Sequence, residues 1–126
     1  MKSILIIEDD ALIRENITTL LDAEGFEVFE AADGQLGLQL ARTSHPDLIL
    51  CDIMLPDLDG YLVLTTLRDD PATANLPFFF LTAKTEPRDQ QLGLQLGADH
   101  YITKPYTRRN LLTVIQTHLG NNAAPL

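Results

Sequence analysis

The distribution of hydrophobic and polar positions along the chain predicts five short strands. Runs dominated by apolar residues, each with the length of a strand, occupy residues 3–7, 48–51 and 76–83, a pattern typical of strands that are buried on both faces of a sheet. Residues 27–31 alternate between polar and apolar side chains, which indicates a more exposed strand near a sheet edge. Residues 100–103 make the fifth expected strand.

Five segments with the period of an amphipathic helix alternate with these strands. They cover residues 11–24, a stretch after Asp33 that ends before Ser44, and residues 61–68, 86–96 and 108–119. Asp33 and Thr107 are the expected N-caps of the second and fifth helices. The buried stripe of the second helix is expected to consist of Leu36, Leu40 and Ala41. The alternation predicts an α/β fold, a doubly wound five-stranded parallel sheet with five helices on both faces.

The length and composition fit one globular domain. The 126 residues suffice for a single core, so we assign residues 1–120 to the domain and residues 121–126 to a C-terminal tail or the start of a linker. The net charge of −9 argues against binding to nucleic acid or to membranes. The apolar runs are too short to span a bilayer, and the N-terminus lacks a signal-peptide pattern. A single cysteine fits a reducing compartment, so we expect a cytoplasmic location.

The cysteine and the histidines are not expected to carry chemistry. Cys51 lies in a buried strand, where a thiol is a small core residue rather than a nucleophile. His45, His100 and His118 fit solvated loop or helix positions, and none of them is a candidate general base.

Polar side chains stand where four of the expected strands end. Glu8 and Asp9 follow the first strand, and Asp52 follows the third. Thr82 lies near the end of the fourth strand, and Lys104 follows the fifth. Because the carboxyl ends of parallel strands share one edge of the sheet, these residues can converge in one crevice. Taken alone, Asp52 could instead open a turn.

The charges at this edge predict a divalent metal ion. The carboxylates of Glu8, Asp9 and Asp52 repel one another unless a cation lies among them or some are protonated. A divalent ion and the Lys104 ammonium would balance them, and all-oxygen ligands suit Mg²⁺. A carboxylate beside Mg²⁺, a hydroxyl and an ammonium can accept a phosphoryl group. Asp52 is the candidate acceptor, and Lys104 and Thr82 are the candidate ligands of the phosphoryl oxygens.

Four segments in order, residues 6–10, 51–60, 81–83 and 97–106, resemble the motifs of receiver domains in two-component response regulators. The resemblance covers residues 1–119, and within this family the sequence resembles the chemotaxis regulators. It implies a flavodoxin-like sheet with the strand order 2-1-3-4-5. It also implies a place in phosphorelay signal transduction, as a phosphoprotein that receives its phosphoryl group from a sensor histidine kinase or a phosphotransfer protein.

The resemblance also implies a role for each residue of the crevice. Asp52 would be the phosphorylated aspartate, and Asp9 a direct ligand of Mg²⁺ (or Mn²⁺), together with Asp52. Glu8 would act mainly through metal-bound water, and the Met54 backbone carbonyl would complete the protein ligands. Lys104 would pair with the phosphoryl group.

The remaining implied roles concern signal output. Thr82 would move toward the phosphoryl group, and Tyr101 would turn inward as Thr82 moves. The peptide bond before Pro105 would be cis. The switch would act on a downstream effector protein or domain through the face made by helix 4, strand 5 and helix 5. Such a protein is not an enzyme, apart from weak self-phosphorylation and self-dephosphorylation.

Two departures from better-known members change what we expect. Met54 and Lys84 occupy the positions two residues after Asp52 and Thr82, which are polar or acidic in relatives that hydrolyse the acyl phosphate quickly. Because Met54 cannot orient water by a strong hydrogen bond and Lys84 could shield the phosphoryl group, we expect slow dephosphorylation.

The second departure concerns self-association. Asp99 is retained from the ion pairs of a common symmetric dimer, but Gln90, Asn110 and Val114 replace charged members of those pairs. We therefore expect a monomer or a dimer of another kind.

Alternative functions stay open at this point. A pseudo-receiver that binds partners without phosphorylation is disfavoured because all five polar residues of the crevice are present. A phosphatase with an aspartate nucleophile typically has a second aspartate where Met54 stands. A flavin mononucleotide carrier needs a hydroxyl-rich and glycine-rich loop where residues 8–10 are acidic.

Overall fold

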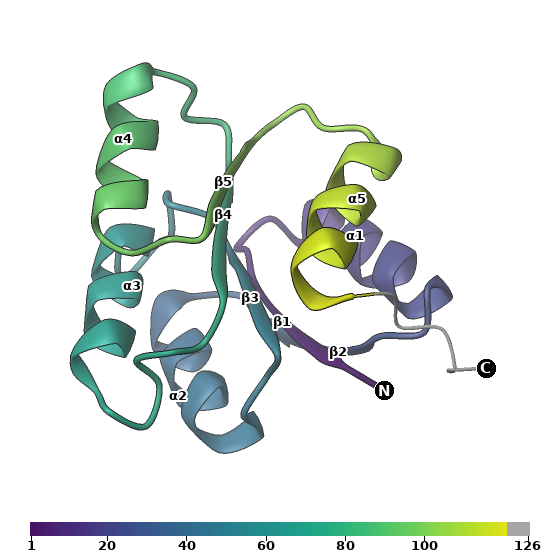
Figure 1. The fold of residues 1–126 in the computed structure, drawn as a ribbon, viewed down its shortest axis with the longest axis horizontal. Coiled ribbons are helices and arrows are strands. Elements are labelled where there is room, and N and C mark those ends of the chain that lie inside the picture. The colour runs from purple at the N-terminus through teal and green to yellow at the C-terminus, as the bar shows by residue number, and fades with distance from the viewer. Residues whose placement is uncertain (121–126) are drawn as a thin grey trace.

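One parallel sheet forms the centre of the molecule, with its strands in the order β2-β1-β3-β4-β5 (Figure 1). The computed structural model describes residues 1–120, so the expected tail or linker at residues 121–126 lies outside the described residues. The strands are β1 Ser3–Ile7, β2 Glu27–Ala31, β3 Leu48–Cys51, β4 Phe78–Thr82 and β5 His100–Thr103. The predicted fold class and strand order are confirmed.

Helices cover both faces of this sheet. They are α1 Ala11–Ala23, α2 Gly34–Ser44, α3 Gly60–Asp69, α4 Pro87–Gln95 and α5 Arg108–Leu119. Helices α1 and α5 lie on one face, and α2, α3 and α4 lie on the other (Figure 1). No helix within residues 1–120 has both the length and the apolar character needed to cross a lipid bilayer.

The sheet separates two hydrophobic clusters, because successive side chains of a strand point to opposite faces. Phe78 and Phe80 of β4 belong to the cluster beneath α2 and α3, whereas Phe79 belongs to the cluster beneath α1 and α5. All three rings are fully buried. The run of apolar residues in β4 therefore supplies both cores at once.

The buried face of α2 differs from the expected one. Leu36 is 39% exposed, so its assignment to the buried stripe is wrong, while Leu38 is only 6% exposed and Ala41 is fully buried. Asp33 caps the helix as predicted, since its side chain accepts a hydrogen bond from the Leu36 backbone N–H. The helix rests on the sheet through Gly37, which packs against the Ile7 side chain. This contact turns Leu36 toward the surface.

The fourth strand is shorter than the predicted residues 76–83. It begins at Phe78, whose backbone N–H donates to the Asp99 carboxylate at 2.9 Å. Pro77, the preceding residue, has no N–H with which to extend the ladder.

Candidate functional site

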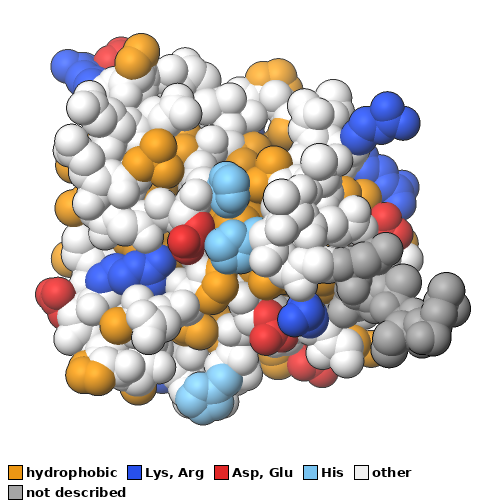
Figure 2. Space-filling view, viewed as in Figure 1, with side chains coloured by type: hydrophobic (Ala, Val, Ile, Leu, Met, Phe, Trp, Pro, Cys, Tyr) orange, Lys and Arg blue, Asp and Glu red, His pale blue; other side chains and the backbone are white. Residues whose placement is uncertain are grey.

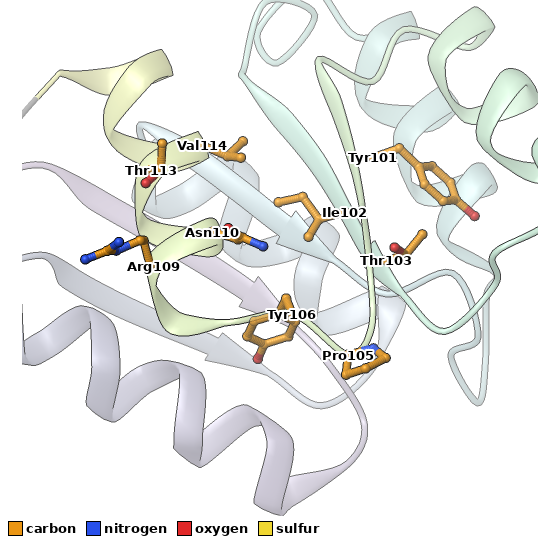
Figure 3. Close-up of a pocket in the computed structure, with 9 residues that line it drawn as sticks. All are labelled: Tyr101, Ile102, Thr103, Pro105, Tyr106, Arg109, Asn110, Thr113 and Val114. Carbon is orange, nitrogen blue, oxygen red and sulfur yellow. The ribbon is translucent and has the colours of Figure 1, made fainter.

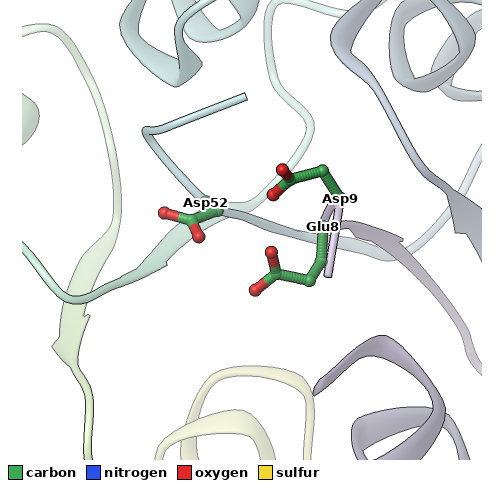
Figure 4. A group of neighbouring side chains, drawn as sticks. All are labelled: Glu8, Asp9 and Asp52. Carbon is green, nitrogen blue, oxygen red and sulfur yellow. The ribbon is translucent and has the colours of Figure 1, made fainter. Parts of the chain in front are cut away.

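Three carboxylates gather at the carboxyl edge of the sheet, where β1 and β3 end (Figure 4). Glu8 and Asp9 follow β1, Asp52 follows β3, and one oxygen from each lies within 4.8 Å of the others. The Glu8 side chain is only 4% exposed and that of Asp52 12%, whereas Asp9 is exposed. The structure thus brings the sequence-predicted acidic residues together around one point that opens to solvent.

Lys104 reaches this cluster from the end of β5. Its ammonium donates to Glu8 Oε1 at 2.6 Å and to Asp52 Oδ2 at 3.1 Å. Its own backbone N–H donates to the Thr82 carbonyl at 2.8 Å, which fixes the residue beside β4. The Lys104–Pro105 peptide bond is cis.

The loop between β3 and α3 holds the Asp52 carboxylate in place. Asp52 Oδ1 accepts hydrogen bonds from the backbone N–H groups of Ile53, at 2.6 Å, and Met54, at 3.3 Å. Gly60 closes the loop, and its N–H donates to the Ile53 carbonyl at 2.7 Å. A Cβ atom on Gly60 would collide with the Asp52 carbonyl and with the Ile53 backbone. Only glycine permits this close approach of backbones.

Burial and charge oppose each other in this cluster. Burial raises the pKa of Glu8, although the hydrogen bond from Lys104 acts in the opposite direction. Burial alone would lower the pKa of Lys104, but its hydrogen bond to Glu8 and the charge of Asp52 outweigh burial, so the pKa is raised. The Lys104 ammonium is therefore firmly protonated. A divalent cation would favour ionisation of Glu8, because its positive charge would stabilise the buried carboxylate.

The donor set fits a hard divalent cation. A pocket of about 330 Å³ opens over the cluster and is lined by Glu8, Asp9, Asp10, Ile13, Asp52, Met54, Ala83 and Lys104. Its oxygen atoms suit Mg²⁺, which retains several waters when a protein binds it. Met54 itself is 61% exposed, so its side chain leaves the pocket open to water.

Thr82 and Tyr101 are connected through Lys84 rather than through Asp52. Thr82 is fully buried, and its hydroxyl accepts from the Lys84 backbone N–H at 3.3 Å. The Tyr101 hydroxyl donates to the Lys84 carbonyl at 2.8 Å. Burial raises the pKa of Tyr101, so the hydroxyl keeps the proton that it donates.

The Tyr101 ring is turned inward beneath α4. It lies against the ring of Phe80, with ring centroids 5.9 Å apart. Gly93 of α4 faces both rings, and a Cβ atom there would lie 3.1 Å from each. The absence of a side chain at Gly93 thus leaves the space that the inward ring fills.

Several residues that shape the site were not predicted. Asp10 lines the pocket and caps α1, where its side chain accepts from the N–H groups of Leu12 and Ile13. Asp57 caps α2 from a distance, accepting from the N–H groups of Gly34 at 2.8 Å and Gln35 at 2.9 Å. An aspartate directly before a helix is a readable signal for Asp10. The partner of Asp57 is distant in sequence, and nothing near Asp57 indicates it.

Cys51 is a core residue, as predicted. It is fully buried, and burial, together with the charge of Asp52, raises the pKa of its thiol well above the usual range. A thiol held neutral in this way is a poor nucleophile.

Comparison with known proteins identifies the family. A sequence model of the response regulator receiver domain matches residues 4–116. The chain belongs to the response regulator receiver domain family. Its place in two-component signalling, which the sequence motifs imply, is thereby confirmed.

Two regulators of similar sequence are about twice as long as this chain. The chain is 40% identical over 118 residues to a probable transcriptional regulator, ycf27, of Porphyridium aerugineum, covering 94% of this chain and 48% of that protein. It is 40% identical over 119 residues to the DNA-binding response regulator MtrA of Mycobacterium tuberculosis, covering 94% of this chain and 51% of that protein. The chain thus spans about half the length of these relatives.

Solved receiver structures have the same fold. A putative response regulator from Chloroflexus aurantiacus superposes with a TM-score of 0.88 at 33% identity, covering 94% of this chain and 97% of that chain. The chemotaxis protein CheY4 of Vibrio cholerae superposes with a TM-score of 0.87 at 30% identity, covering 93% of this chain and 98% of that chain.

Proposed function

We propose that Asp52 accepts a phosphoryl group from a sensor histidine kinase or a phosphotransfer protein, and that the domain acts as a signalling switch rather than as an enzyme. The proposal rests mainly on the Lys104 ammonium, which lies 3.1 Å from one Asp52 oxygen. The other oxygen is held by backbone N–H groups of the following loop. An acceptor oxygen that already faces a fixed cation is positioned for an anionic group.

Mg²⁺ or Mn²⁺ would be held by Asp9, Asp52 and the Met54 carbonyl, with Glu8 acting mainly through bound water. When bound, the ion would neutralise charge on the transferring phosphoryl group. The chain's own contribution is to keep Asp52 fixed and Lys104 charged. Once the group is attached, Lys104 and the Thr82 hydroxyl would bind its oxygens.

Signal output would pass from Thr82 to Tyr101 and on to an effector protein or domain. Both side chains meet Lys84, which gives movement of Thr82 a direct route to the tyrosine. A groove of about 460 Å³ lies beside β5, between the strand and α5 (Figure 3). Tyr106 and Val114 line this groove, while the Tyr101 ring points away from α5 (Figure 3). Because the Tyr101 ring already lies inward in this structure, contact with Lys84 would hold it there, and rotation of the ring outward would change one border of a surface to which a partner can bind.

The domain itself is proposed to act as a monomer or as a dimer other than the common symmetric one. Asp99, the retained member of the common dimer's ion pairs, is engaged within the chain by the Phe78 N–H at 2.9 Å and by Arg68 at 3.5 Å. Gln90 and Asn110 carry no charge to replace the missing partners. With a net charge of −9, the domain is also not expected to contact nucleic acid or membranes directly.

The proposal is tested by incubating the protein with Mg²⁺ and a small acyl-phosphate donor. We expect the mass of one phosphoryl group on the protein, stable to acid, labile to base and absent from the D52N variant. The D22N variant, which removes an exposed aspartate from α1, should be phosphorylated like the wild type. Continuous release of phosphate would indicate a phosphatase instead, and no incorporation would indicate a pseudo-receiver.

The same preparation tests the lifetime of the phosphorylated state. After removal of the donor, we expect slow loss of the phosphoryl group, because the exposed Met54 side chain cannot orient an attacking water and Lys84 can shield the group. Replacement by the polar pair, M54N with K84E, should accelerate the loss. Decay of the wild-type protein within seconds would contradict the expectation.

A further inference from the structure

Two histidine rings from different elements meet at the end of β5 that is remote from Lys104. His100 is the first residue of β5 and His118 lies in the last turn of α5, and their ring centroids are 6.0 Å apart with an interplanar angle of 85°. The expectation that His100 occupies a solvated loop or helix is wrong, because it lies half-buried in a strand.

Both rings are held by Phe79. His100 packs edge to face on this ring with centroids 4.7 Å apart, and His118 does so at 5.2 Å. Phe79 is itself fully buried in the core beneath α1 and α5. The two imidazoles are therefore fixed against a rigid support, so little ordering would be needed to bring them onto one ligand.

The polar atoms of this pair have no protein partner within residues 1–120. Neither imidazole makes a hydrogen bond or an ion pair with a described residue, whereas the neighbouring Asp99 carboxylate is bound to the Phe78 N–H and to Arg68. Figure 2 shows two histidine side chains lying side by side on the face that also carries β5. The ring nitrogens are thus open to a ligand from solvent.

We propose that His100 and His118 form a two-histidine site for a divalent transition-metal ion such as Zn²⁺. Imidazole nitrogen is a preferred ligand of Zn²⁺, Ni²⁺ and Cu²⁺. With Zn–N bonds of about 2.0–2.1 Å and tetrahedral angles, two imidazoles on one ion have centroids roughly 5–5.5 Å apart. The observed 6.0 Å is slightly wider, so a small rotation of the exposed His118 side chain would bring both rings onto one ion. Water would fill the remaining positions of the ion.

This site differs in place and in chemistry from the acidic pocket. The pocket lies at the carboxyl edge of the sheet and offers oxygen ligands suited to Mg²⁺. The histidine pair lies at the amino end of β5 and offers nitrogen. An ion bound there would join the edge strand β5 to the last turn of α5. Binding of this ion does not depend on phosphorylation of Asp52.

The test is a titration of untagged protein with ZnCl₂, in excess Mg²⁺ so that the acidic pocket is occupied. Calorimetry should show one equivalent of Zn²⁺ bound, and the binding should weaken at least about tenfold in H100Q and in H118Q. His45, the third histidine, is the C-cap residue of α2 and supplies the matched control. The H45N variant should bind Zn²⁺ like the wild type.

Imidazole NMR of the wild-type protein provides a second measurement that does not depend on the folding of variants. We expect the ring resonances of His100 and His118 to shift together on addition of Zn²⁺, and those of His45 to stay unchanged. The proposal is overturned if Zn²⁺ leaves both rings unperturbed, or if both glutamine variants retain wild-type affinity. Reversal of the shifts by a chelator would support it.

Discussion

At the scale of single residues, Lys104 controls the charge balance of the acidic cluster. Its ammonium lies 2.6 Å from a Glu8 oxygen and 3.1 Å from an Asp52 oxygen. It therefore competes with Mg²⁺ for the negative charge of these carboxylates. We expect K104M to bind Mg²⁺ more tightly, by roughly tenfold, because a competing positive charge is lost. The same variant should be phosphorylated more slowly, because the group that faces the acceptor oxygen is gone. Calorimetric titration with MgCl₂ and phosphorylation time courses measure the two effects.

The matched control for this prediction is K84M. It removes the same charge from a residue whose ammonium makes no hydrogen bond or ion pair within residues 1–120. Its affinity for Mg²⁺ should change much less than that of K104M. Equal tightening in both variants would show that net charge, rather than the position of Lys104, determines the effect.

Asp57 is a second residue with an effect beyond its own loop. The hydrogen bond from the Gly34 backbone is the main cause that lowers the pKa of its carboxyl below the ordinary 3.8; burial acts in the opposite direction, and the hydrogen bonds from Gln35 and Leu58 add to the lowering. A carboxyl whose pKa is lowered by folding stabilises the protein above its unfolded-state pKa, and this stability disappears as pH falls through the folded-state value. We therefore expect D57N to lower the urea midpoint at about pH 7.

The difference between D57N and the wild type should begin to shrink as pH falls to about 3.8, and it should vanish below the lowered folded-state pKa, where Asp57 of the folded wild type also becomes neutral. Urea unfolding curves across this range measure it. D22N serves as the control, because the Asp22 side chain makes no hydrogen bond or ion pair with a described residue. A difference that persists unchanged at the lowest pH would mean that geometry rather than charge makes the contribution.

At the scale of elements, Arg68 connects the end of α3 to the loop before β4 and to the loop before β5. Its guanidinium donates to the carbonyls of Ala74 at 3.2 Å, Leu76 at 2.7 Å and Gly97 at 2.9 Å. Its side chain is 20% exposed. We expect R68M to reduce the free energy of unfolding by about 2 kcal/mol, because several carbonyls lose a charged donor. Denaturant titration gives the value.

The corresponding control is R88M. Arg88 pairs with Glu86 at 2.8 Å, but both side chains are largely exposed, at 83% and 62%. Exposed pairs of this kind contribute about 0–1 kcal/mol, so R88M should leave the midpoint nearly unchanged. A loss of equal size in both variants would argue against the connecting role of Arg68.

The elements themselves could be predicted because their patterns are local. The apolar runs of β1 and β3 and the expected N-caps Asp33 and Thr107 are each visible within a few residues, and all are confirmed. The error at Leu36 arose because helical spacing defines a stripe but not which stripe faces the sheet. The face of α2 that packs on the sheet is determined by Gly37, because the absence of a side chain there leaves room for the Ile7 side chain.

At the scale of the whole molecule, the topology of the sheet brings residues of separate sequence motifs together in one site. It also produces contacts that no sequence motif predicts. Glu8 and Lys104 could be placed together because both end parallel strands of one sheet. The tether from Asp57 to α2 and the contact of His100 with His118 join elements whose relative position depends on packing. Such contacts require coordinates, since neither partner carries a local signal for the other.

The acidic cluster should make stability of the whole domain depend on Mg²⁺. A ligand that binds only the folded state stabilises it by mass action, by about 2.7 kcal/mol at 100 times Kd. For a chain of 126 residues this corresponds to a rise in Tm of roughly 10 °C. We expect this rise with MgCl₂ and its loss in D9N, because Asp9 supplies one of the three clustered carboxylates. D22N should respond like the wild type.

Sodium chloride at the same ionic strength separates specific binding from general screening of the net charge of −9. Screening would raise Tm in all three proteins and with either salt. Binding at the cluster would raise it only with Mg²⁺, and only where Asp9 is intact. A rise in the Tm of D9N equal to that of the wild type would show that Asp9 is not a ligand of the metal ion. Because the measurement follows unfolding alone, it tests the metal site independently of phosphoryl transfer to Asp52.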